Sequence, residues 1–383
     1  MSSTTLRVPA VIVGGGPAGI ATAACLERRG LHPVVLEKGD TVAPAWRRHY
    51  ERLHLHTTRR ASALPGRPMP STYPRYPSRD QVFAYLAQYA RDEGLDVRFD
   101  TEVTRCRRDA GAWRVETAAG ECFEAHHVVI ATGLSDVPRI PEFPNQDAFG
   151  GEILHSAAYR NGKPYAGRRV LVVGFGNSAA EIALDLLEHG AEPHVSVRSP
   201  TVVVPRDILG IPILTLSRFF SLFPPRLADR LSSPIRRIKM GDVSETGIPA
   251  PEKGPMEQLA TQRKVPVLDI GTMAALRAGD IRAHPGVKSF TADGVGFMDG
   301  STEPFDAVVL GTGFTPGVDR FLETTATVLD DSGRPLVSGG ATAEPGLYFC
   351  GFQESPRGRL HHIGLEAERL AALIAVRETP QGR

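Results

Sequence analysis

A strand, a glycine-rich turn and a helix follow one another twice along this chain, and this repeat constrains the fold most. The first copy is VIVGGGPAGIATAACLERRGLHPVVLEK (11–38). Its apolar strand ends at Val13, and the turn that follows fits G-x-G-x-x-G with Gly14, Gly16 and Gly19. In such a turn the first glycine allows a tight bend, the second lets backbone amides approach a pyrophosphate, and the third lets helix and strand pack closely. The pattern predicts a dinucleotide site at the helix N-terminus.

The second copy is RRVLVVGFGNSAAEIALDLLEHGAEPHVSVRS (168–199). Here Gly174, Gly176 and Ala179 take the three positions of the glycine pattern. An apolar strand is expected before the turn and another after the helix. A second dinucleotide site is therefore predicted.

Two such units indicate an α/β protein with two Rossmann-like dinucleotide-binding domains. A length of 383 residues and a mass of 41.3 kDa fit two domains better than one. We expect the second domain to be inserted into the first. The predicted boundaries are 1–160 for the first part of the first domain, 161–285 for the inserted domain and 286–383 for the second part of the first domain.

The two copies end in residues of opposite charge. The first ends in Glu37, whose carboxylate can accept hydrogen bonds from ribose hydroxyls and repels a 2′-phosphate. The second ends in Arg198 and Ser199, which suit a 2′-phosphate. The second site is therefore expected to prefer NADPH, and the alternative is that Arg198 is only a solvated charge at a strand end.

Two further segments resemble each other. HHVVIATG (126–133) and FDAVVLGTGF (305–314) are apolar strands followed by Thr-Gly. Such turns let the chain leave a sheet beside a bound nucleotide. The closing segment (346–376) is predicted to form a strand, a glycine-rich loop and a helix whose N-terminus faces electron-rich ligand atoms.

Composition excludes several classes of function. Lys plus Arg is 44 and Asp plus Glu is 43, so a nucleic-acid partner is not expected. The four cysteines form no C-x-x-C pair, which argues against a redox dithiol and a zinc site, and no metal is expected. The most apolar later segment (208–223) is too short to span a bilayer. We expect a soluble, cytoplasmic protein without an integral membrane segment.

The stretch FGGEILHSAAY (149–159) identifies a family. It matches F-x-G-x-x-x-H-x-x-x-Y, and with the two glycine turns on either side the chain resembles the flavin-containing monooxygenases. The sister Baeyer–Villiger group usually ends this motif in Trp, where this chain has Tyr159. The segments 52–90, 204–210 and 266–281 look like those of the YUCCA-type enzymes and their bacterial relatives.

The resemblance implies FAD in the first domain and NADPH in the second. It implies that NADPH reduces the flavin, that the reduced flavin captures dioxygen, and that the resulting flavin hydroperoxide oxygenates a small organic substrate. YUCCA-type enzymes oxidatively decarboxylate indole-3-pyruvate, so an aryl 2-oxo acid is one expected substrate, with nitrogen or sulfur oxygenation as the other possibility. A homodimer is compatible with this interpretation.

The glycine turns and the resemblance together give an expected set of cofactor-binding residues. In chain order they are Gly14, Gly16, Pro17, Ala18, Gly19, Glu37, Lys38, Trp46, Val103, Thr132, Gly133, Gly174, Gly176, Asn177, Ser178, Ala179, Arg198, Ser199, Thr312, Gly313, Gly351 and Leu360. By resemblance Trp46 packs near the FAD, Val103 meets the adenine through its backbone, and Gly351 and Leu360 approach the flavin. His155 of the family motif is expected to place the linker between domains and not to shuttle protons.

The candidate catalytic residues are His56 and Thr57. In RLHLHT, His54 and His56 would share one face of an alternating strand, and a histidine titrates near neutral pH. The alternative is a histidine that fills a polar niche in the core. Animal-type members of the family carry an Asn near the flavin at about this position, so their amine chemistry does not transfer directly.

Two other functions remain open at this stage. One is an NADPH-dependent flavoprotein reductase that inserts no oxygen. The other is a non-catalytic flavin redox sensor, although the chain has no additional effector domain to transmit a signal.

Overall fold

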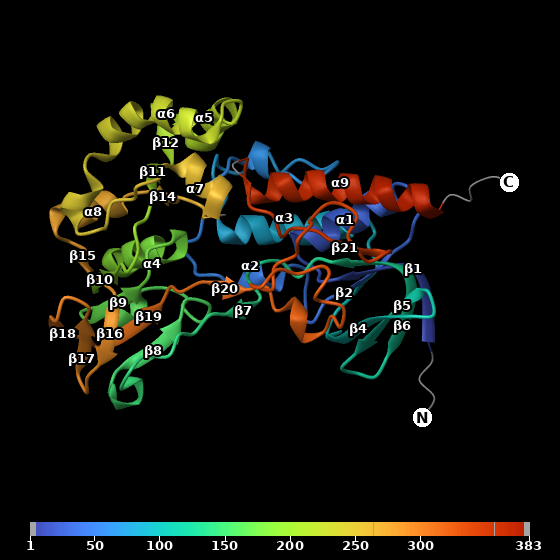
Figure 1. Cartoon of the computed structure of the whole chain (residues 1–383), viewed down its shortest axis with the longest axis horizontal. Coiled ribbons are helices and arrows are strands. Elements are labelled where there is room, and N and C mark those ends of the chain that lie inside the picture. Colours follow the sequence, from blue (N-terminus) through green and yellow to red (C-terminus); the bar gives the residue numbers. More distant parts are fainter. Residues whose placement is uncertain (1–4, 263, 356, 379–383) are drawn as a thin grey trace. The chain divides into compact units, whose positions relative to one another are not determined.

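The apolar strand of each copy lies between two parallel neighbours in a sheet, in a computed structural model that describes residues 5–262, 264–355 and 357–378 (Figure 1). The chain divides into two compact units. The first comprises the residues up to Arg47, Thr57–Val137 and the residues from Phe314 onward. The second comprises Arg48–His56 and Pro138–Gly313. The predicted pair of Rossmann-like units is confirmed, and so is the insertion of the second into the first.

The first unit is built on a seven-stranded sheet in which β1 is central. Its strands run in the order β3-β2-β1-β6-β5-β4, and β21 pairs with the second half of β6. Their bounds are β1 (Thr5–Val13), β2 (Val34–Leu36), β3 (Val97–Arg98), β4 (Val103–Asp109), β5 (Ala112–Thr117), β6 (Cys122–Ile130) and β21 (Leu347–Phe349).

Helices of the first unit position the first glycine turn. They are α1 (Pro17–Glu27), α2 (Pro44–Arg48), η1 (Arg59–Ser62), α3 (Arg79–Asp92), η5 (Val318–Arg320) and α9 (Arg359–Glu378). Helix α1 packs lengthwise against α9 (Figure 1). Nine of the eleven residues of α1 are buried, because small side chains such as Ala21 and Ala24 let both the sheet and α9 approach it.

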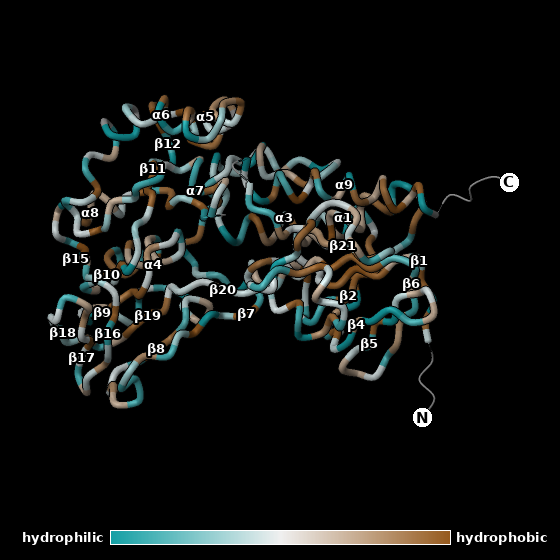
Figure 2. Tube along the Cα trace, viewed as in Figure 1, coloured by the Kyte–Doolittle hydropathy of each residue, from teal (hydrophilic) through white to brown (hydrophobic). Residues whose placement is uncertain are grey.

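The second unit has a five-stranded parallel sheet in the order β15-β10-β9-β19-β8. Its strands are β8 (Glu152–His155), β9 (Arg169–Val173), β10 (Glu192–Ser196), β15 (Arg282–His284) and β19 (Ala307–Leu310). An antiparallel sheet of β16 (Val287–Phe290), β17 (Gly294–Phe297) and β18 (Thr302–Pro304) follows β15 in the chain. Figure 2 shows the hydrophobic residues concentrated along the parallel strands of both units, as expected for strands buried on both faces.

The remaining elements of the second unit are helices and short strands. They are η2 (Gln146–Ala148), η3 (Lys163–Tyr165), α4 (Asn177–Glu188), β11 (Val203–Pro205), β12 (Asp207–Ile208), β13 (Ile211–Pro212), α5 (Ile213–Phe220), α6 (Pro225–Met240), η4 (Val243–Thr246), α7 (Pro255–Gln262), β14 (Val267–Asp269) and α8 (Thr272–Ala278). The short strands β7 (Val137–Pro138) and β20 (Phe314–Thr315) lie where the chain passes between units.

The unit boundaries differ from the predicted residues 160 and 285. Strand β8 pairs with β19, and β19 pairs with β9, so both belong to the second sheet. The second unit therefore begins at Pro138 and ends at Gly313. A short excursion, Arg48–His56, also belongs to it. These pairings join residues far apart in sequence, which local patterns do not specify.

No helix in the described part of the chain combines the length and hydropathy that a bilayer span requires. Among the same residues, no group of three or more His, Cys, Asp and Glu side chains is arranged to hold a metal ion. All four cysteines are buried and free.

Candidate functional site

The first glycine turn lies between β1 and α1. Gly14 has φ +105°, and a Cβ on it would lie 2.9 Å from the Ala131 carbonyl oxygen. A Cβ on Gly19 would lie only 1.9 Å from the Gly14 carbonyl oxygen. A Cβ on Gly16 would meet no atom within 4 Å. The first and third glycines are thus required by the turn and the packing, whereas the second leaves open space.

The start of α1 has unused hydrogen-bond donors beside that space. The helix begins at Pro17, and its N-cap residue, Gly16, provides no side-chain cap. Ala18 and Gly19 follow in the first turn, where backbone N–H groups have no acceptor within the helix. Donors and a helix dipole that point into open space form an anion-binding position.

Glu37 stands at the end of β2 with its carboxylate already fixed. Its side chain is buried and accepts hydrogen bonds from the Gly15 N–H at 2.7 Å and the Gly39 N–H at 2.8 Å. The next residue, Lys38, is exposed and pairs with Asp136 at 2.6 Å. The structure therefore brings Glu37, but not the ammonium group of Lys38, against the glycine turn.

The second glycine turn repeats this geometry between β9 and α4. Gly174 has φ +106°, and a Cβ on it would lie 2.6 Å from the Gly311 carbonyl oxygen. A Cβ on Gly176 would meet nothing within 4 Å. Helix α4 also lacks a side-chain cap at its N-cap residue. At the third position, Ala179 fits because its methyl group faces Gly311. A Cβ added to Gly311 would lie 2.8 Å from the Ala179 Cβ.

Two predicted residues of the second turn have their side chains committed elsewhere. The Asn177 amide donates to the Pro266 carbonyl at 3.2 Å and accepts from the Leu268 N–H at 2.8 Å. It therefore holds β14 in place, and only its backbone is left for a ligand. Ser178 interacts with the hydroxyl of the buried Tyr50.

Arg198 and Ser199 lie just beyond β10 and are both exposed. The aliphatic part of Arg198 lies over Gly286, on which a Cβ would be 3.1 Å from its Cγ. The guanidinium makes no ion pair with any residue the structure describes. It has room for an anionic ligand, and its role in binding a 2′-phosphate stays a prediction.

The two Thr-Gly turns have similar backbones and different side-chain partners. Gly133 has φ +80° and Gly313 has φ +83°. The Thr132 hydroxyl is buried without a hydrogen-bond partner in the described chain, whereas the Thr312 hydroxyl donates to the Arg139 carbonyl. An orphaned buried hydroxyl is costly unless a ligand satisfies it, which favours Thr132 as a contact.

The segment from β21 to α9 brings Gly351 to the first turn. Gly351 has φ +87°, and a Cβ on it would lie 2.8 Å from the Ala18 Cβ. Its N–H donates to the fully buried Glu366 at 2.6 Å. Leu360 is buried at the start of α9. Gly351 therefore lies against the N-terminus of α1, and the approach of Gly351 and Leu360 to a flavin stays a prediction.

Trp46 and Val103 are less closely tied to the turn. Trp46 is half-buried on α2 and its N–H donates to the Ala43 carbonyl at 2.9 Å. Val103 begins the edge strand β4, three strands away from β1. Their contacts with a cofactor remain predictions.

The candidate catalytic residues His56 and Thr57 are adjacent in sequence but fall in different units. The Thr57 hydroxyl is hydrogen-bonded to the Ser62 hydroxyl at 2.6 Å. His56 Nε2 lies 2.7 Å from Glu181 Oε1. The expected alternating strand is wrong: residues 52–56 form no strand, and His54 is exposed. Local polar contacts to α4, and not sheet pairing, shape this segment.

The motif at 149–159 is part of the second unit, and each of its fixed residues has a packing role. Phe149 packs edge-on against Phe290 with ring centroids 5.4 Å apart. A Cβ on Gly151 would lie 2.6 Å from the Asp306 carbonyl oxygen. The Tyr159 hydroxyl donates to Asp185 at 2.6 Å. The motif thus fastens β8 to the second sheet.

His155, the remaining motif residue, has both ring nitrogens engaged. Nδ1 accepts from the Ala157 N–H at 3.1 Å, so Nε2 carries the proton and donates to the Gly313 carbonyl at 3.0 Å. Burial lowers the pKa of this histidine. A neutral, doubly bonded imidazole suits the structural role expected for it.

Sequence reasoning missed a buried polar cluster on α4. Glu181 and Asp185 are each 2% exposed, and they face Tyr50, His56 and Tyr159. Burial, together with the Glu181 charge, raises the pKa of Tyr50 well above its ordinary value. The signal lay in the helix sequence AAEIALDLLE, where two acids occupy positions four apart among apolar residues.

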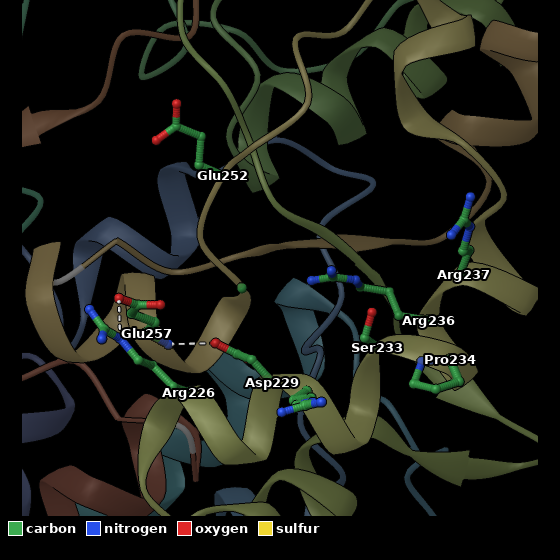
Figure 3. Close-up of a pocket in the computed structure, with 10 residues that line it drawn as sticks. Arg226, Asp229, Ser233, Pro234, Arg236, Arg237, Glu252 and Glu257 are labelled. Carbon is green, nitrogen blue, oxygen red and sulfur yellow. Dashed lines mark hydrogen bonds and ion pairs between the residues drawn. The ribbon is translucent and has the colours of Figure 1, made fainter.

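A cavity of about 520 Å³ lies beside α6 in the second unit (Figure 3). Arginines of α6, including Arg226 and Arg230, line it together with Glu252 and Glu257. Asp229 accepts two backbone N–H groups at the start of α7, each at 2.9 Å. None of the predicted site residues lines this cavity, so it is not the predicted cofactor site.

Sequence comparisons agree with this geometry. A family model described as pyridine nucleotide-disulphide oxidoreductase matches residues 11–208. The chain is 39% identical to indole-3-pyruvate monooxygenase YUCCA1 of Oryza sativa subsp. japonica, covering 90% of this chain and 86% of that protein. It is 38% identical to indole-3-pyruvate monooxygenase YUCCA6 of Arabidopsis thaliana, covering 94% and 88%.

Solved structures give the same picture. The flavin-containing monooxygenase from Stenotrophomonas maltophilia superposes with a TM-score of 0.75 at 25% identity, covering 97% of this chain and 99% of that one. A cyclohexanone monooxygenase with bound epsilon-caprolactone gives a TM-score of 0.77 at 21% identity, covering 98% and 88%. The second likeness concerns the fold alone.

Proposed function

This chain belongs to the flavin-dependent monooxygenase family that contains the YUCCA enzymes, and we propose that it uses FAD and NADPH to oxygenate an aryl 2-oxo acid such as indole-3-pyruvate. Class membership makes it an oxidoreductase of the monooxygenase type. The proposed substrate is that of the indole-3-pyruvate monooxygenases, which match 90% and 94% of this chain.

The pair of open glycine turns supports this proposal most directly. Each turn has a second glycine that faces open space and a helix start without a side-chain cap. One turn lies beside a fixed carboxylate, Glu37, and the other has the unpaired Arg198 at the corresponding strand end. A resident FAD on the first turn and an NADPH on the second fit both sets of groups.

The protein's contribution is to bind and orient. FAD, when bound, supplies the oxygen chemistry. Glu37 would hold a ribose of the FAD, and the buried Thr132 hydroxyl would gain the partner it lacks. Arg198 and Ser199 would select the 2′-phosphate of NADPH. Gly351 would let the chain approach the flavin closely because its positive φ and the nearby Ala18 leave no room for a side chain.

Thr57 and His56 are proposed to contact the flavin end of the site. The Ser62 hydroxyl donates to the Thr58 carbonyl at 3.0 Å, so the Thr57 hydroxyl donates to Ser62 and its oxygen is left to accept from a ligand. The Glu181 carboxylate lies 2.7 Å from His56 Nε2 and would fix the orientation of the imidazole.

Oxygen coupling tests the proposal. The purified protein with FAD and NADPH should consume one dioxygen for each indole-3-pyruvate converted to indole-3-acetate and carbon dioxide. A panel with phenylpyruvate, an amine and a thioether separates 2-oxo acids from nitrogen or sulfur substrates. Many turnovers under anaerobic conditions would instead show the reductase that inserts no oxygen, and negligible NADPH oxidation with every substrate would indicate the redox sensor.

We also propose a cytoplasmic location and allow a homodimer. Four buried free thiols suit a reducing compartment. Cell fractionation tests the location, and light scattering after gel filtration tests the assembly.

A further inference from the structure

The excursion Arg48–His56 is held on helix α4 by polar side chains at three points. Arg52 makes a two-pronged contact with Glu188 at 2.9 and 2.7 Å. His56 Nε2 lies 2.7 Å from Glu181 Oε1. Tyr50, which is 3% exposed, interacts through its hydroxyl with Ser178 and Glu181. We call these contacts the α4 clamp.

Glu181 is the clamp residue that interacts with both His56 and Tyr50. It is 2% exposed, and by geometry neither of its oxygens has a hydrogen-bond partner among the described residues. Its carboxylate lies against the imidazole of His56, with Oε1 2.7 Å from Nε2. A buried carboxylate without a compensating group is strongly unfavourable, so His56 and Glu181 stabilise each other's position.

The clamp joins two places that the proposed function uses. Ser178 and Glu181 lie in the first two turns of α4, directly after Gly176. At its other end, the excursion leads within one residue from His56 to Thr57. Tyr50 interacts with both Ser178 and Glu181, so movement of this part of α4 is transmitted to the excursion.

We propose that Glu181 is a positioning residue that couples the NADPH-binding turn of α4 to His56 and Thr57. This inference rests on the proposed function. Its charge holds His56, His56 fixes the end of the excursion, and Tyr50 keeps the first turn of α4 in the form that receives the coenzyme. Glu181 itself touches no substrate or cofactor in this scheme.

Helix α4 provides a matched control one turn further on. Asp185 is also 2% exposed and accepts a hydrogen bond from Tyr159 at 2.6 Å, but Tyr159 lies in the family motif and not in the excursion. Glu181→Gln and Asp185→Asn remove the same charge from the same helix. A purely structural role predicts similar consequences for both variants.

The test combines binding and hydrogen exchange on the FAD-loaded protein. In Glu181→Gln we expect NADP⁺ affinity to fall about tenfold, exchange in residues 48–58 to rise, and kcat for NADPH oxidation to fall more than KM for the 2-oxo acid changes. In Asp185→Asn we expect a lower melting temperature with NADP⁺ affinity and exchange in 48–58 unchanged. A cycle with His56→Gln should show that the two losses are not additive.

Equal losses of NADP⁺ affinity in both variants, or additive effects of Glu181→Gln and His56→Gln, would overturn the coupling. Where Glu181→Gln does not fold, Tyr50→Phe keeps the ring and removes the hydroxyl, and it should weaken NADP⁺ binding in the same way. If the wild-type protein fails to bind NADP⁺, the proposed function is wrong. If the wild type binds NADP⁺ and the Glu181→Gln variant binds it equally well, only this inference is contradicted.

Discussion

The two glycine turns have nearly the same backbone, but the positions of one glycine and one alanine are swapped between them. In the first turn the helix contributes Gly19 and the end of the neighbouring strand contributes Ala131. In the second turn the helix contributes Ala179 and the strand end contributes Gly311. Each turn therefore combines one glycine with one alanine, which shows that the third glycine of the pattern is a packing requirement shared between two elements.

The residues at the two strand ends, Glu37 and Arg198, differ more than the turns do. Glu37 is 5% exposed and is held by two backbone N–H groups before any ligand arrives. Arg198 is exposed and makes no ion pair with the described residues. A pre-organised group lowers the entropic cost of binding, which suits a cofactor that stays bound, while an exposed guanidinium suits a coenzyme that must enter and leave.

Removing the Glu37 charge is expected to have the largest effect. In Glu37→Gln the side-chain size is kept, but an amide group replaces one of the two acceptor oxygens. We expect FAD affinity of the apoprotein to fall about 100-fold, or about 3 kcal/mol, because hydrogen bonds to a charged group are lost. A fluorescence titration with FAD measures this. Glu27→Gln is the control, since Glu27 pairs only with the exposed His32; equal losses in both variants would contradict the role of Glu37.

Adding a methyl group at Gly311 tests whether the two turns are equivalent. A Cβ there would lie 2.8 Å from the Ala179 Cβ, so Gly311→Ala should destabilise the protein by about 2 kcal/mol through overpacking. The double variant Gly311→Ala with Ala179→Gly recreates the arrangement of the first turn and should regain most of the loss. Urea unfolding measures both. A double variant as unstable as the single one would show that the two turns are not equivalent.

Acid is expected to loosen the second unit first. Burial lowers the pKa of His194 from 6.5 to about 4, and burial also lowers the pKa of its neighbour His284. Between pH 6.5 and 4 the unfolded chain binds more protons than the folded chain. The stability that neutral His194 contributes is therefore complete above about pH 6.5 and is lost as the pH falls toward 4. At pH 5 the loss is about 2 kcal/mol.

Hydrogen exchange at pH values between 7.5 and 5, corrected for intrinsic rates, locates this loss. Peptides of the β9–β10–β15 region should lose protection before those of β1 and β6. His194→Leu should flatten the pH dependence. Equal loss of protection in both sheets would contradict the assignment to His194.

The sequence predicts the turns well because their requirements are local. The separate roles of Gly14 and Gly19, the strand before each turn and the insertion of one unit into the other are confirmed. The boundaries are not predicted correctly, since β19 joins the second sheet by pairing with β9, more than a hundred residues away, and β8 joins it by pairing with β19.

The candidate site is predicted in part. Glu37 is found where the pattern puts it, but the commitment of the Asn177 side chain to Leu268 depends on a segment about ninety residues away. The burial of Glu181 opposite His56 is also non-local, and a short polar excursion gives no periodicity from which its docking could be inferred.

Substituting Arg198 is the smallest and the most selective test of the comparison. In Arg198→Ala we expect NADPH affinity to fall about tenfold, or about 1.4 kcal/mol, with NADH affinity almost unchanged, since only the 2′-phosphate would meet the guanidinium. Arg282→Ala is the control. Arg282 is also an exposed arginine of this sheet, but it lies at the start of β15 and pairs with Glu192. Titration with both coenzymes over a range of salt concentrations should show that the Arg198→Ala effect shrinks as salt screens the charges. Equal losses for NADPH and NADH would mean that Arg198 is a solvated strand-end charge, and the contrast between the buried Glu37 carboxylate and the exposed Arg198 guanidinium would then carry no information about coenzyme choice.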